Sequence, residues 1–264
     1  MVKRIASRAY LWIILLFLYA PILTLIVLSF NESKSRAKWG GFTFDWYIEL
    51  FQNEDIIEAL YTTLILAFLS AFIATILGTL ASIGMNSMKR TPRAVLTAIT
   101  NIPMLNADIV TGVSLMLLFI AINAVFRFNY QLGFASVLLS HITFNIPYVI
   151  LNVMPKLRQT NRNTYEAALD LGASPLYAFY KVIFPDILPG VVSGFLFAFT
   201  MSLDDFVITH FTKGPGIDTL STKIYTEVRK GIKPEMYALS TLLFVSVMIL
   251  LFIINRRSSK KEDM

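Results

Sequence analysis

The feature that most constrains this chain is a series of apolar stretches, each about as long as a membrane-spanning helix. A helix needs about 20 apolar residues to cross the hydrocarbon core of a bilayer. Such stretches cover residues 9–29, 60–84, 95–125, 132–154, 187–211 and 236–254. Only 15% of the residues are charged, whereas a soluble domain carries about 25%. We therefore predict an all-α, polytopic membrane protein with six transmembrane helices, which has the lipid bilayer as its surroundings.

The apolar stretches also set the expected domain organisation. We expect one transmembrane domain over residues 1–264, with an N-terminal helix at 9–29 and core helices at about 60–255. The first stretch is too long for the apolar part of a signal peptide, and no small-x-small cleavage site follows it, so we predict that it stays in the protein. Pro103 lies inside the third stretch, where it predicts a kink or a break because proline removes a backbone donor.

The distribution of basic residues predicts the orientation. If the N-terminus lies in the cytoplasm, the inner segments hold 14 of the 23 Lys and Arg residues and the outer loops hold 9. Cytoplasmic loops are enriched in these residues. We therefore expect both termini in the cytoplasm.

Composition excludes several other functions. The net charge of +6 is spread over loops between apolar stretches and not gathered on one basic face, so we expect no nucleic-acid partner. The chain has no cysteine, which excludes disulfides and thiolate metal sites. Its two histidines are too few for a histidine-rich metal site. We expect no cofactor and no metal.

Small residues recur every four positions along the second stretch, at Ser70, Ala74, Gly78 and Ser82. This spacing places them on one helix face, where a neighbouring backbone can approach closely. Ordinary helix packing and packing that shifts during a transport cycle both account for the pattern.

The segment at about 161–186, between the fourth and fifth stretches, is long enough to have structure and work of its own. Asn163 followed by Glu166 resembles an N-terminal capping pair, so we predict a short helix over 165–171. Gly172 is placed to end this helix in a left-handed conformation.

A second short helix is predicted directly after the first. Ser174 followed by Pro175 is a helix start signal, and Pro185 is expected to end the helix. An apolar face at helical spacing is formed by Leu176, Phe179, Tyr180 and Ile183. Such a helix pair could rest on lipid or could dock into a groove on a soluble partner.

The same segment resembles a known motif. Glu166-Ala167-Ala168, Gly172 and the ending Ile183-Phe184-Pro185 are similar to the EAA loop of ABC importer permeases, with Phe184 in place of the usual leucine. The resemblance implies a type I permease fold and a coupling helix that sits in a cleft of an ATPase subunit. The coupling residues that it implies are Glu166, Ala167, Ala168, Gly172 and Pro185. The chain has no GxxxxGK[ST] phosphate-binding loop, so we expect a transporter subunit and not an enzyme.

The resemblance extends over most of the chain to the spermidine/putrescine permeases of the second type. It is carried by 140–144, 166–172, 202–205, 214–215 and 223–225. It implies a bacterial inner-membrane importer of polyamines. The implied partners are a second, different permease subunit, a pair of ATP-binding cassette ATPases and an extracytoplasmic polyamine-binding protein.

Three carboxylates lie at membrane depth, at Asp108, Asp204 and Asp205. A charged residue near the centre of a spanning helix costs roughly 2.5–3.5 kcal/mol on insertion scales, so it is usually functional or paired. No Lys or Arg lies at that depth to pair with them. We predict that they line a pathway for a cationic substrate, with Phe206 and Tyr148 adding cation–π attraction.

Other interpretations of these residues remain open. Asp108 could cap the helix that follows the break near Pro103, and Asp204 and Asp205 could face the outer water without contacting a substrate. His141 follows Ser140, but neighbouring residues on a helix point apart. We therefore read His141 as a polar packing residue and not as half of a catalytic dyad.

Three alternative functions follow from the same sequence. The permease architecture could serve another solute such as thiamine, ferric iron or a phosphonate, but an anionic cargo predicts basic residues at membrane depth, and none is present. An intramembrane hydrolase needs a Ser–His or Asp–Asp constellation from different helices. A purely structural membrane subunit has no need of the EAA loop.

Overall fold

The computed structural model describes residues 2–126, 131–246 and 248, and these are almost entirely helical. Within the described residues, β-pairing is limited to a single bridge between Asn31 and Phe42. Contacts divide the chain into two compact units. Unit 1 comprises Met1–Ile57 and Lys223–Met264, and unit 2 comprises Glu58–Thr222.

Unit 1 contains α1 (Val2–Ser29) and α2 (Asp45–Gln52), together with a helix at 234–246 and the ends of two helices that continue into unit 2. The connection between α1 and α2 is held by buried polar groups. The indole Nε1 of Trp46 donates a hydrogen bond to the carbonyl of Asn31 at 2.7 Å. The side-chain oxygen of Asn31 accepts from the backbone N–H of Gly40 at 2.8 Å. Since these groups are paired, the connection can be partly buried at low cost.

Charged side chains in unit 1 pair with one another. The ammonium of Lys233 lies 3.5 Å from a carboxylate oxygen of Glu227 and 3.4 Å from one of Glu235. Both carboxylates are largely buried, whereas the Lys233 side chain is exposed. Glu235 and then Glu227 raise the pKa of the Lys233 ammonium, because the negative charges favour its charged form. Lys233 therefore stays charged at neutral pH and offsets the burial of two acids.

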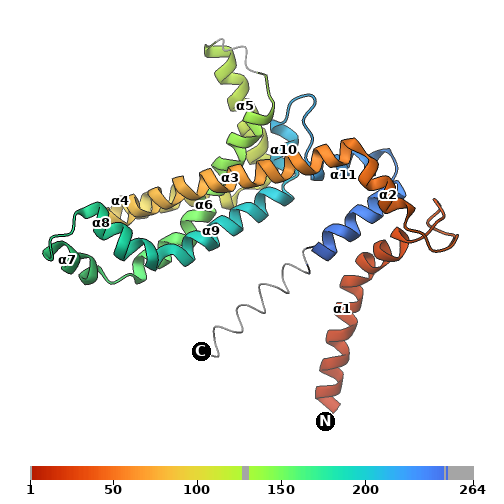
Figure 1. The fold of residues 1–264 in the computed structure, drawn as a ribbon, viewed down its shortest axis with the longest axis horizontal. Helices are drawn as coiled ribbons and strands as arrows, with labels where there is room; N and C mark the ends of the chain where they lie inside the picture. The colour runs from red at the N-terminus through yellow and green to blue at the C-terminus, as the bar shows by residue number, and fades with distance from the viewer. Residues whose placement is uncertain (1, 127–130, 247, 249–264) are drawn as a thin grey trace. The chain divides into compact units, whose positions relative to one another are not determined.

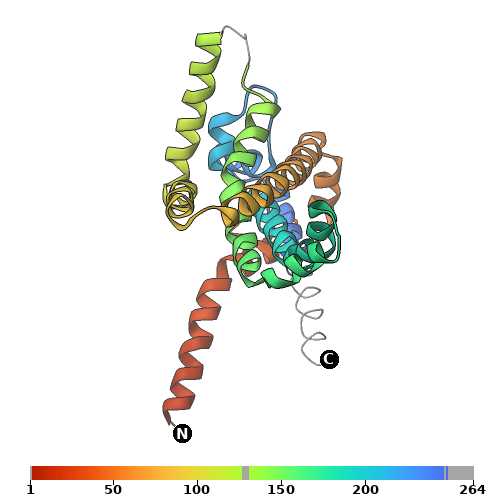
Figure 2. The same ribbon diagram turned by 90° about the vertical axis from the view of Figure 1, so that its left-hand side faces the viewer.

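Unit 2 is built on three long helices that run side by side, α3 (Glu54–Ser87), α6 (Phe134–Gln159) and α9 (Phe184–Asp204) (Figure 1). The remaining helices are α4 (Arg90–Leu105), α5 (Asp108–Phe126), α7 (Arg162–Asp170), α8 (Pro175–Ala178), α10 (Val207–Thr212) and α11 (Leu220–Lys230). A π-helical turn, η1 (Phe179–Ile183), joins α8 to α9. The short helices α7 and α8 lie together at one end of α9 (Figures 1 and 2).

Two stripes of small residues bring the three long helices together. The predicted stripe on α3 is buried, with Ser70, Ala74 and Ser82 all at 0% exposure. A second stripe, which the sequence analysis did not single out, runs along α9 at Gly190, Gly194, Ala198 and Ser202. Val149 of α6 packs against both stripes. A Cβ placed on Gly78 would lie 2.8 Å from the side chain of Val149, and one on Gly194 would lie 3.3 Å from its Cα. Small residues thus allow backbones to approach closely, as packing between membrane helices requires.

Five helices in the described part of the chain are long and apolar enough to span a membrane. They match the first five predicted stretches. For the sixth, expected at 236–254, the structure describes a helix at 234–246, and much of the remaining stretch lies outside the described residues. The basic residues Arg127 and Arg256 to Lys261, which entered the count of charges, also lie outside them.

Two of the predicted stretches are broken. The third contains Pro103 and divides into α4 and α5 at Asn106–Ala107, a few residues after the proline. The fifth was expected to run unbroken from 187 to 211, and this is wrong. Helix α9 ends at Asp204, the backbone of Asp205 is extended, and α10 begins at Val207. The hydrogen bonds that Asp205 accepts from α10 favour this break over a continuous helix.

The segment 161–186 forms the two predicted helices with two differences in detail. The cap of α7 is Asn161, whose side chain accepts from the backbone N–H of Asn163, and not Asn163 itself. Pro185 does not end the second helix, because the chain continues from α8 through η1 into α9. The wide turn of a π-helix precedes Pro185 and accommodates a residue that lacks a backbone N–H.

Candidate functional site

A cavity of about 280 Å³ lies in unit 2, where α5, α6 and the junction between α9 and α10 meet. All five residues that the sequence analysis assigned to a substrate pathway line it, namely Asp108, Tyr148, Asp204, Asp205 and Phe206. The break after α4 and the break after α9 bring these residues together, because each break places a carboxylate at a helix end. None of the side chains that line the cavity is basic.

Two of the three acids are open to solvent. Asp108 and Asp204 are exposed, and neither has a hydrogen-bond or ion-pair partner among the residues described. Asp108 occupies the first turn of α5, where a negative charge is favourable near the positive end of the helix dipole. Its side chain makes no capping hydrogen bond within that described turn. Asp108 and Asp204 are therefore carboxylates available to an external cation.

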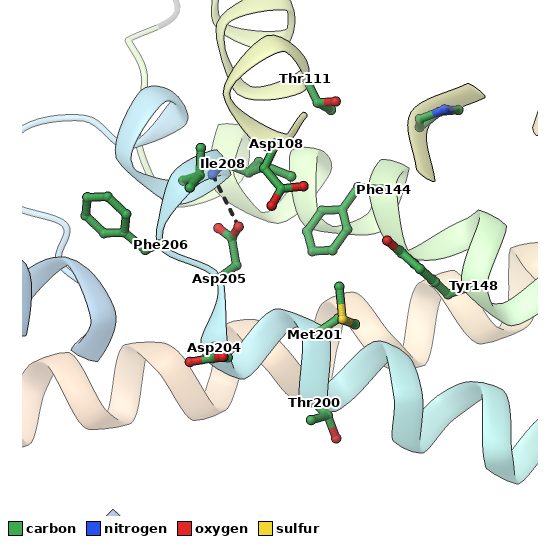
Figure 3. A pocket seen from close by; sticks show the side chains of 12 residues that line it. Asp108, Thr111, Phe144, Tyr148, Thr200, Met201, Asp204, Asp205, Phe206 and Ile208 are labelled. Carbon is green, nitrogen blue, oxygen red and sulfur yellow. Dashed lines mark hydrogen bonds between the residues drawn. The ribbon is translucent and has the colours of Figure 1, made fainter. Parts of the chain in front are cut away.

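Asp205 has a different environment, since its side chain is only 9% exposed. Oδ1 accepts from the backbone N–H of Ile208 at 3.2 Å (Figure 3). Oδ2 accepts from the backbone N–H and from the hydroxyl of Thr209, at 2.8 and 2.9 Å. Asp205 thus ties the junction to the first turn of α10, in the manner of a capping residue. In Figure 3 its carboxylate is directed toward the same space as that of Asp108, and Asp204 is turned away.

A buried polar network continues from Asp205 into the core. His141 of α6 is completely buried, and its Nε2 lies 2.8 Å from the hydroxyl of Thr209 and 3.4 Å from Oδ2 of Asp205. Its Nδ1 lies 2.5 Å from the hydroxyl of Ser202, which in turn lies 2.9 Å from the hydroxyl of Ser70. The network therefore joins α3, α6, α9 and α10.

This network was only partly visible in the sequence. We expected His141 to be a polar packing residue, and its burial fits that expectation. The sequence offers no Lys or Arg at membrane depth as a partner for the acids, whereas the structure pairs Asp205 with a histidine 64 positions earlier in the chain. One signal pointed in this direction. Ser70 and Ser202 end stripes of small residues, and a hydroxyl in such a stripe faces a neighbouring helix.

Ser202, His141 and Asp205 resemble the constellation of a serine hydrolase, but their surroundings differ from an active site. Ser202 is 2% exposed, and it does not line the cavity. A nucleophile has to meet its substrate at a position that the substrate can reach. The hydroxyl of Ser202 instead bridges His141 to Ser70, so the arrangement is a packing network.

Aromatic rings form another part of the cavity wall. Tyr148 is half-buried and packs against Phe197 with the ring centroids 5.3 Å apart. Phe144 is buried and lies edge-on to the ring of His141, at 5.3 Å. Figure 3 shows the ring of Phe206 directed away from the space between the carboxylates. Tyr148 is therefore better placed than Phe206 to offer a ring face to a cation near Asp108.

The predicted coupling residues lie together at the far end of α9 (Figures 1 and 2). Glu166, Ala167 and Ala168 are on α7, and Glu166 and Ala167 are exposed. Gly172 has the predicted left-handed conformation, with φ at +88°. Large apolar side chains around it face outward, including Leu171 at 90% exposure and Leu176 at 83%. Exposed apolar side chains of this size mark interaction surfaces.

Comparison with known proteins places these features in a family. Residues 74–263 match the family described as "Binding-protein-dependent transport system inner membrane component". The chain is 40% identical to the "Putrescine transport system permease protein PotI" of Escherichia coli (strain K12) over 242 residues, which cover 90% of this chain and 85% of that protein. It is 36% identical to the "Spermidine/putrescine transport system permease protein PotC" of Haemophilus influenzae, with 97% of each chain covered.

A solved structure supports the same fold. A chain from the crystal structure of a bacterial ABC transporter involved in the import of the acidic polysaccharide alginate matches with a TM-score of 0.77 and 19% identity, covering 98% of this chain and 95% of that one. With the membrane-spanning helices and the sequence relatives, this places the fold among ABC importer permeases. The chain belongs to the family of inner membrane components of binding-protein-dependent transport systems and is homologous to the spermidine/putrescine permease subunits.

Proposed function

We propose that this chain is a permease subunit of an ATP-driven importer and that it carries polyamines across the inner membrane. The observation that carries the proposal is the cavity in unit 2, which three carboxylates and no basic side chain line. Polyamines bear several ammonium groups, and carboxylates attract these groups. The printed names of the relatives, which are putrescine and spermidine/putrescine permeases, support this substrate class.

The different environments of the three acids fit transport of a cation better than tight binding of one. Asp108 and Asp204 are exposed and have no partner in the described part of the chain, so they can attract an ammonium group. Asp205 is engaged by Ile208 and Thr209, so it adds negative charge at a fixed position. A site that passes its cargo on must hold it weakly.

The coupling role of α7 and α8 is the second part of the proposal. We infer that Glu166 and the apolar side chains near Gly172 dock onto an ATP-binding cassette ATPase, which supplies the hydrolysis. The exposure of Leu171 and Leu176 supports docking onto a protein, because these apolar side chains face outward on a pair of helices whose N-termini are capped. With this loop in the cytoplasm, both termini also lie there.

The remaining partners complete the importer. We infer a second, different permease subunit and an extracytoplasmic polyamine-binding protein. One of the structural relatives is a bacterial alginate ABC transporter in complex with a pentasaccharide-bound periplasmic protein. That structure supports an assembly of this type for the fold.

An uptake measurement tests the proposed function. The complex of this chain with its ATPase and partner permease is reconstituted into liposomes, and uptake of labelled putrescine and spermidine is measured with the binding protein present. We expect ATP-dependent uptake that unlabelled polyamine competes away and that thiamine does not. Uptake of neither polyamine by an assembled complex with active ATPase would contradict the proposal.

A further inference from the structure

The hydrogen-bond partners of Asp205 and Thr209 determine which nitrogen of His141 carries a proton. The hydroxyl of Thr209 has one hydrogen, and it donates that hydrogen to Oδ2 of Asp205 at 2.9 Å. The hydroxyl oxygen of Thr209 lies 2.8 Å from Nε2 of His141. Since the Thr209 hydroxyl has already used its hydrogen, it must accept from His141, so Nε2 carries a proton.

The other side of the imidazole completes the chain of hydrogen bonds. In a neutral ring protonated on Nε2, Nδ1 is an acceptor, so it accepts from the hydroxyl of Ser202. The hydroxyl of Ser202 also lies 2.9 Å from that of Ser70 on α3, which is 3.2 Å from the carbonyl of Ala67. Every member of the chain is nearly or completely buried, so a broken link would leave a polar group without water to replace it.

We propose that His141 is a positioning residue for transport, because it holds the hydroxyl of Thr209 on Asp205 and so fixes the carboxylate of Asp205 toward the cavity. The inference rests on the proposed function, since it assigns a residue to the path of the cationic cargo. His141 does not line the cavity. It reaches Asp205 through the hydroxyl of Thr209, and its Nε2 also lies 3.4 Å from Oδ2 of Asp205.

The fixed carboxylate matters because Asp205 lies at the break between α9 and α10. Its Oδ2 holds two donors from Thr209, whereas Oδ1 holds only the backbone N–H of Ile208 at 3.2 Å. A carboxylate oxygen can accept more than one hydrogen bond. Oδ1 therefore keeps capacity for an ammonium group that enters the cavity. Without His141, the Thr209 hydroxyl is free to turn away, and the carboxylate is then held only by the backbone N–H groups of Ile208 and Thr209.

The test uses variants that separate the two ring nitrogens. The amide nitrogen of glutamine can take the place of Nε2 and donate to Thr209, whereas leucine removes both nitrogens. We expect His141→Leu to lower polyamine uptake at subsaturating concentration by about tenfold, as the loss of a hydrogen bond in a charge-assisted network does. We expect the His141→Gln variant to retain most of the wild-type uptake. Ser140→Ala is the matched control, because Ser140 is equally buried but bonds only to Ser136 of its own helix.

A double-mutant cycle distinguishes positioning from a general structural role. If His141 acts through Asp205, His141→Leu should have little further effect once Asp205→Asn is present, and the double variant should match the single Asp205→Asn variant within about twofold. Losses that multiply across the cycle, or an unchanged His141→Leu variant, would overturn the proposal.

A second pair of variants keeps the proposal testable if His141→Leu fails to assemble. Thr209→Val preserves the branched shape and removes the hydroxyl that links His141 to Asp205, whereas Thr209→Ser retains it. We expect reduced uptake for Thr209→Val and near-normal uptake for Thr209→Ser. Wild-type uptake by the valine variant would count against the mechanism.

A readout that needs no cargo separates this inference from the proposed function. The chain has two histidines, so the difference between ¹⁵N-histidine NMR spectra of the wild-type and His141→Gln complexes isolates the signal of His141. We expect a proton on Nε2 and a change of that signal in Thr209→Val. A ring without a proton on Nε2 would refute the positioning role even if polyamine uptake is observed. Absence of uptake with the expected spectrum would instead refute the polyamine assignment.

Discussion

At the scale of single residues, one side-chain type has two environments within the same cavity. Asp108 and Asp204 are exposed and unpaired among the described residues, and Asp205 is nearly buried with three hydrogen bonds from α10. A buried carboxylate is tolerated only when donors replace its water. The same residue type can therefore attract a substrate at one position and hold a helix end at the next.

The first prediction separates these roles. We expect Asp108→Asn and Asp204→Asn to lower polyamine uptake while leaving thermal stability unchanged, because both carboxylates are exposed. We expect Asp205→Ala to lower uptake and also to destabilise the protein by about 1 kcal/mol, the usual cost of a lost capping side chain. Uptake and the thermal unfolding of the purified complex are measured for each variant. Unaltered uptake by an Asp108→Asn, Asp204→Asn double variant would mean that these acids do not form the path.

At the scale of helices, close approach depends on small residues in register. The α3 stripe was visible in the sequence as a four-residue repeat, and its burial shows that it packs. Gly78 and Gly84 both belong to α3, yet only Gly78 meets a neighbour, at 2.8 Å from the side chain of Val149. A Cβ on Gly84 meets nothing within 4 Å in the described structure.

This contrast gives the second prediction. We expect Gly78→Ala to destabilise the protein by about 1–3 kcal/mol, because the added methyl group overpacks the contact with Val149. We expect Gly84→Ala to be neutral or to stabilise it by up to about 1 kcal/mol, since alanine is the better helix former. Thermal unfolding in detergent compares the two. Equal effects of both substitutions would show that the contact at Val149 is not limiting.

The third prediction concerns the turn at Gly172 between α7 and α8, for which we propose a coupling role. Gly172 has φ of +88° with open space around it, so valine there would strain the backbone without a clash of side chains. Gly216, with φ of +79° and equally open space, is a matched control outside the loop. We expect Gly172→Val to reduce co-purification of the ATPase severalfold and Gly216→Val to leave it unchanged. Co-purification at the wild-type level with Gly172→Val would exclude a coupling role for this turn.

Glu166→Lys is the fourth prediction. Glu166 is exposed on α7, so charge reversal should leave the membrane fold intact and weaken docking of the ATPase. Chain yield in the membrane reports insertion, and the ATPase recovered with the purified chain reports docking. A normal yield with reduced ATPase is the expected result, and normal recovery of both would argue against an electrostatic role at this position.

At the scale of the whole molecule, several of the described helices carry exposed apolar side chains. On α1, for example, Trp12 is 72% exposed and Phe17 is 82% exposed. In the window of α5 that could span the membrane, 6% of the residues are buried. Surfaces of this kind require lipid or a partner helix.

We therefore predict that this chain alone forms no working pathway. A single permease would leave the polar wall of its cavity without a facing subunit, which a bilayer does not tolerate. Liposomes containing this chain and the ATPase, with and without the second permease, are compared for polyamine uptake. We expect uptake only with both permeases, and robust uptake with this chain as the sole permease would disprove the requirement.

The sequence by itself determined the membrane class, five of the helices and the turn at Gly172. These follow from local rules, because a run of about 20 apolar residues and a glycine after a short helix carry their own physical signal. The sequence also named five of the twelve residues that line the cavity, three of them because a charge at membrane depth is conspicuous. It did not predict that the fifth stretch breaks at Asp205.

Only the tertiary structure decided how those acids differ. The distinction between Asp204 and Asp205 depends on donors from α10 and on His141, which lies on a helix far away in sequence. Likewise, the need for glycine at Gly190 and Gly194 arises only because α6 packs closely against them. A hydrogen bond between helices depends on their relative position and rotation, and no local pattern in one helix encodes the partner on another.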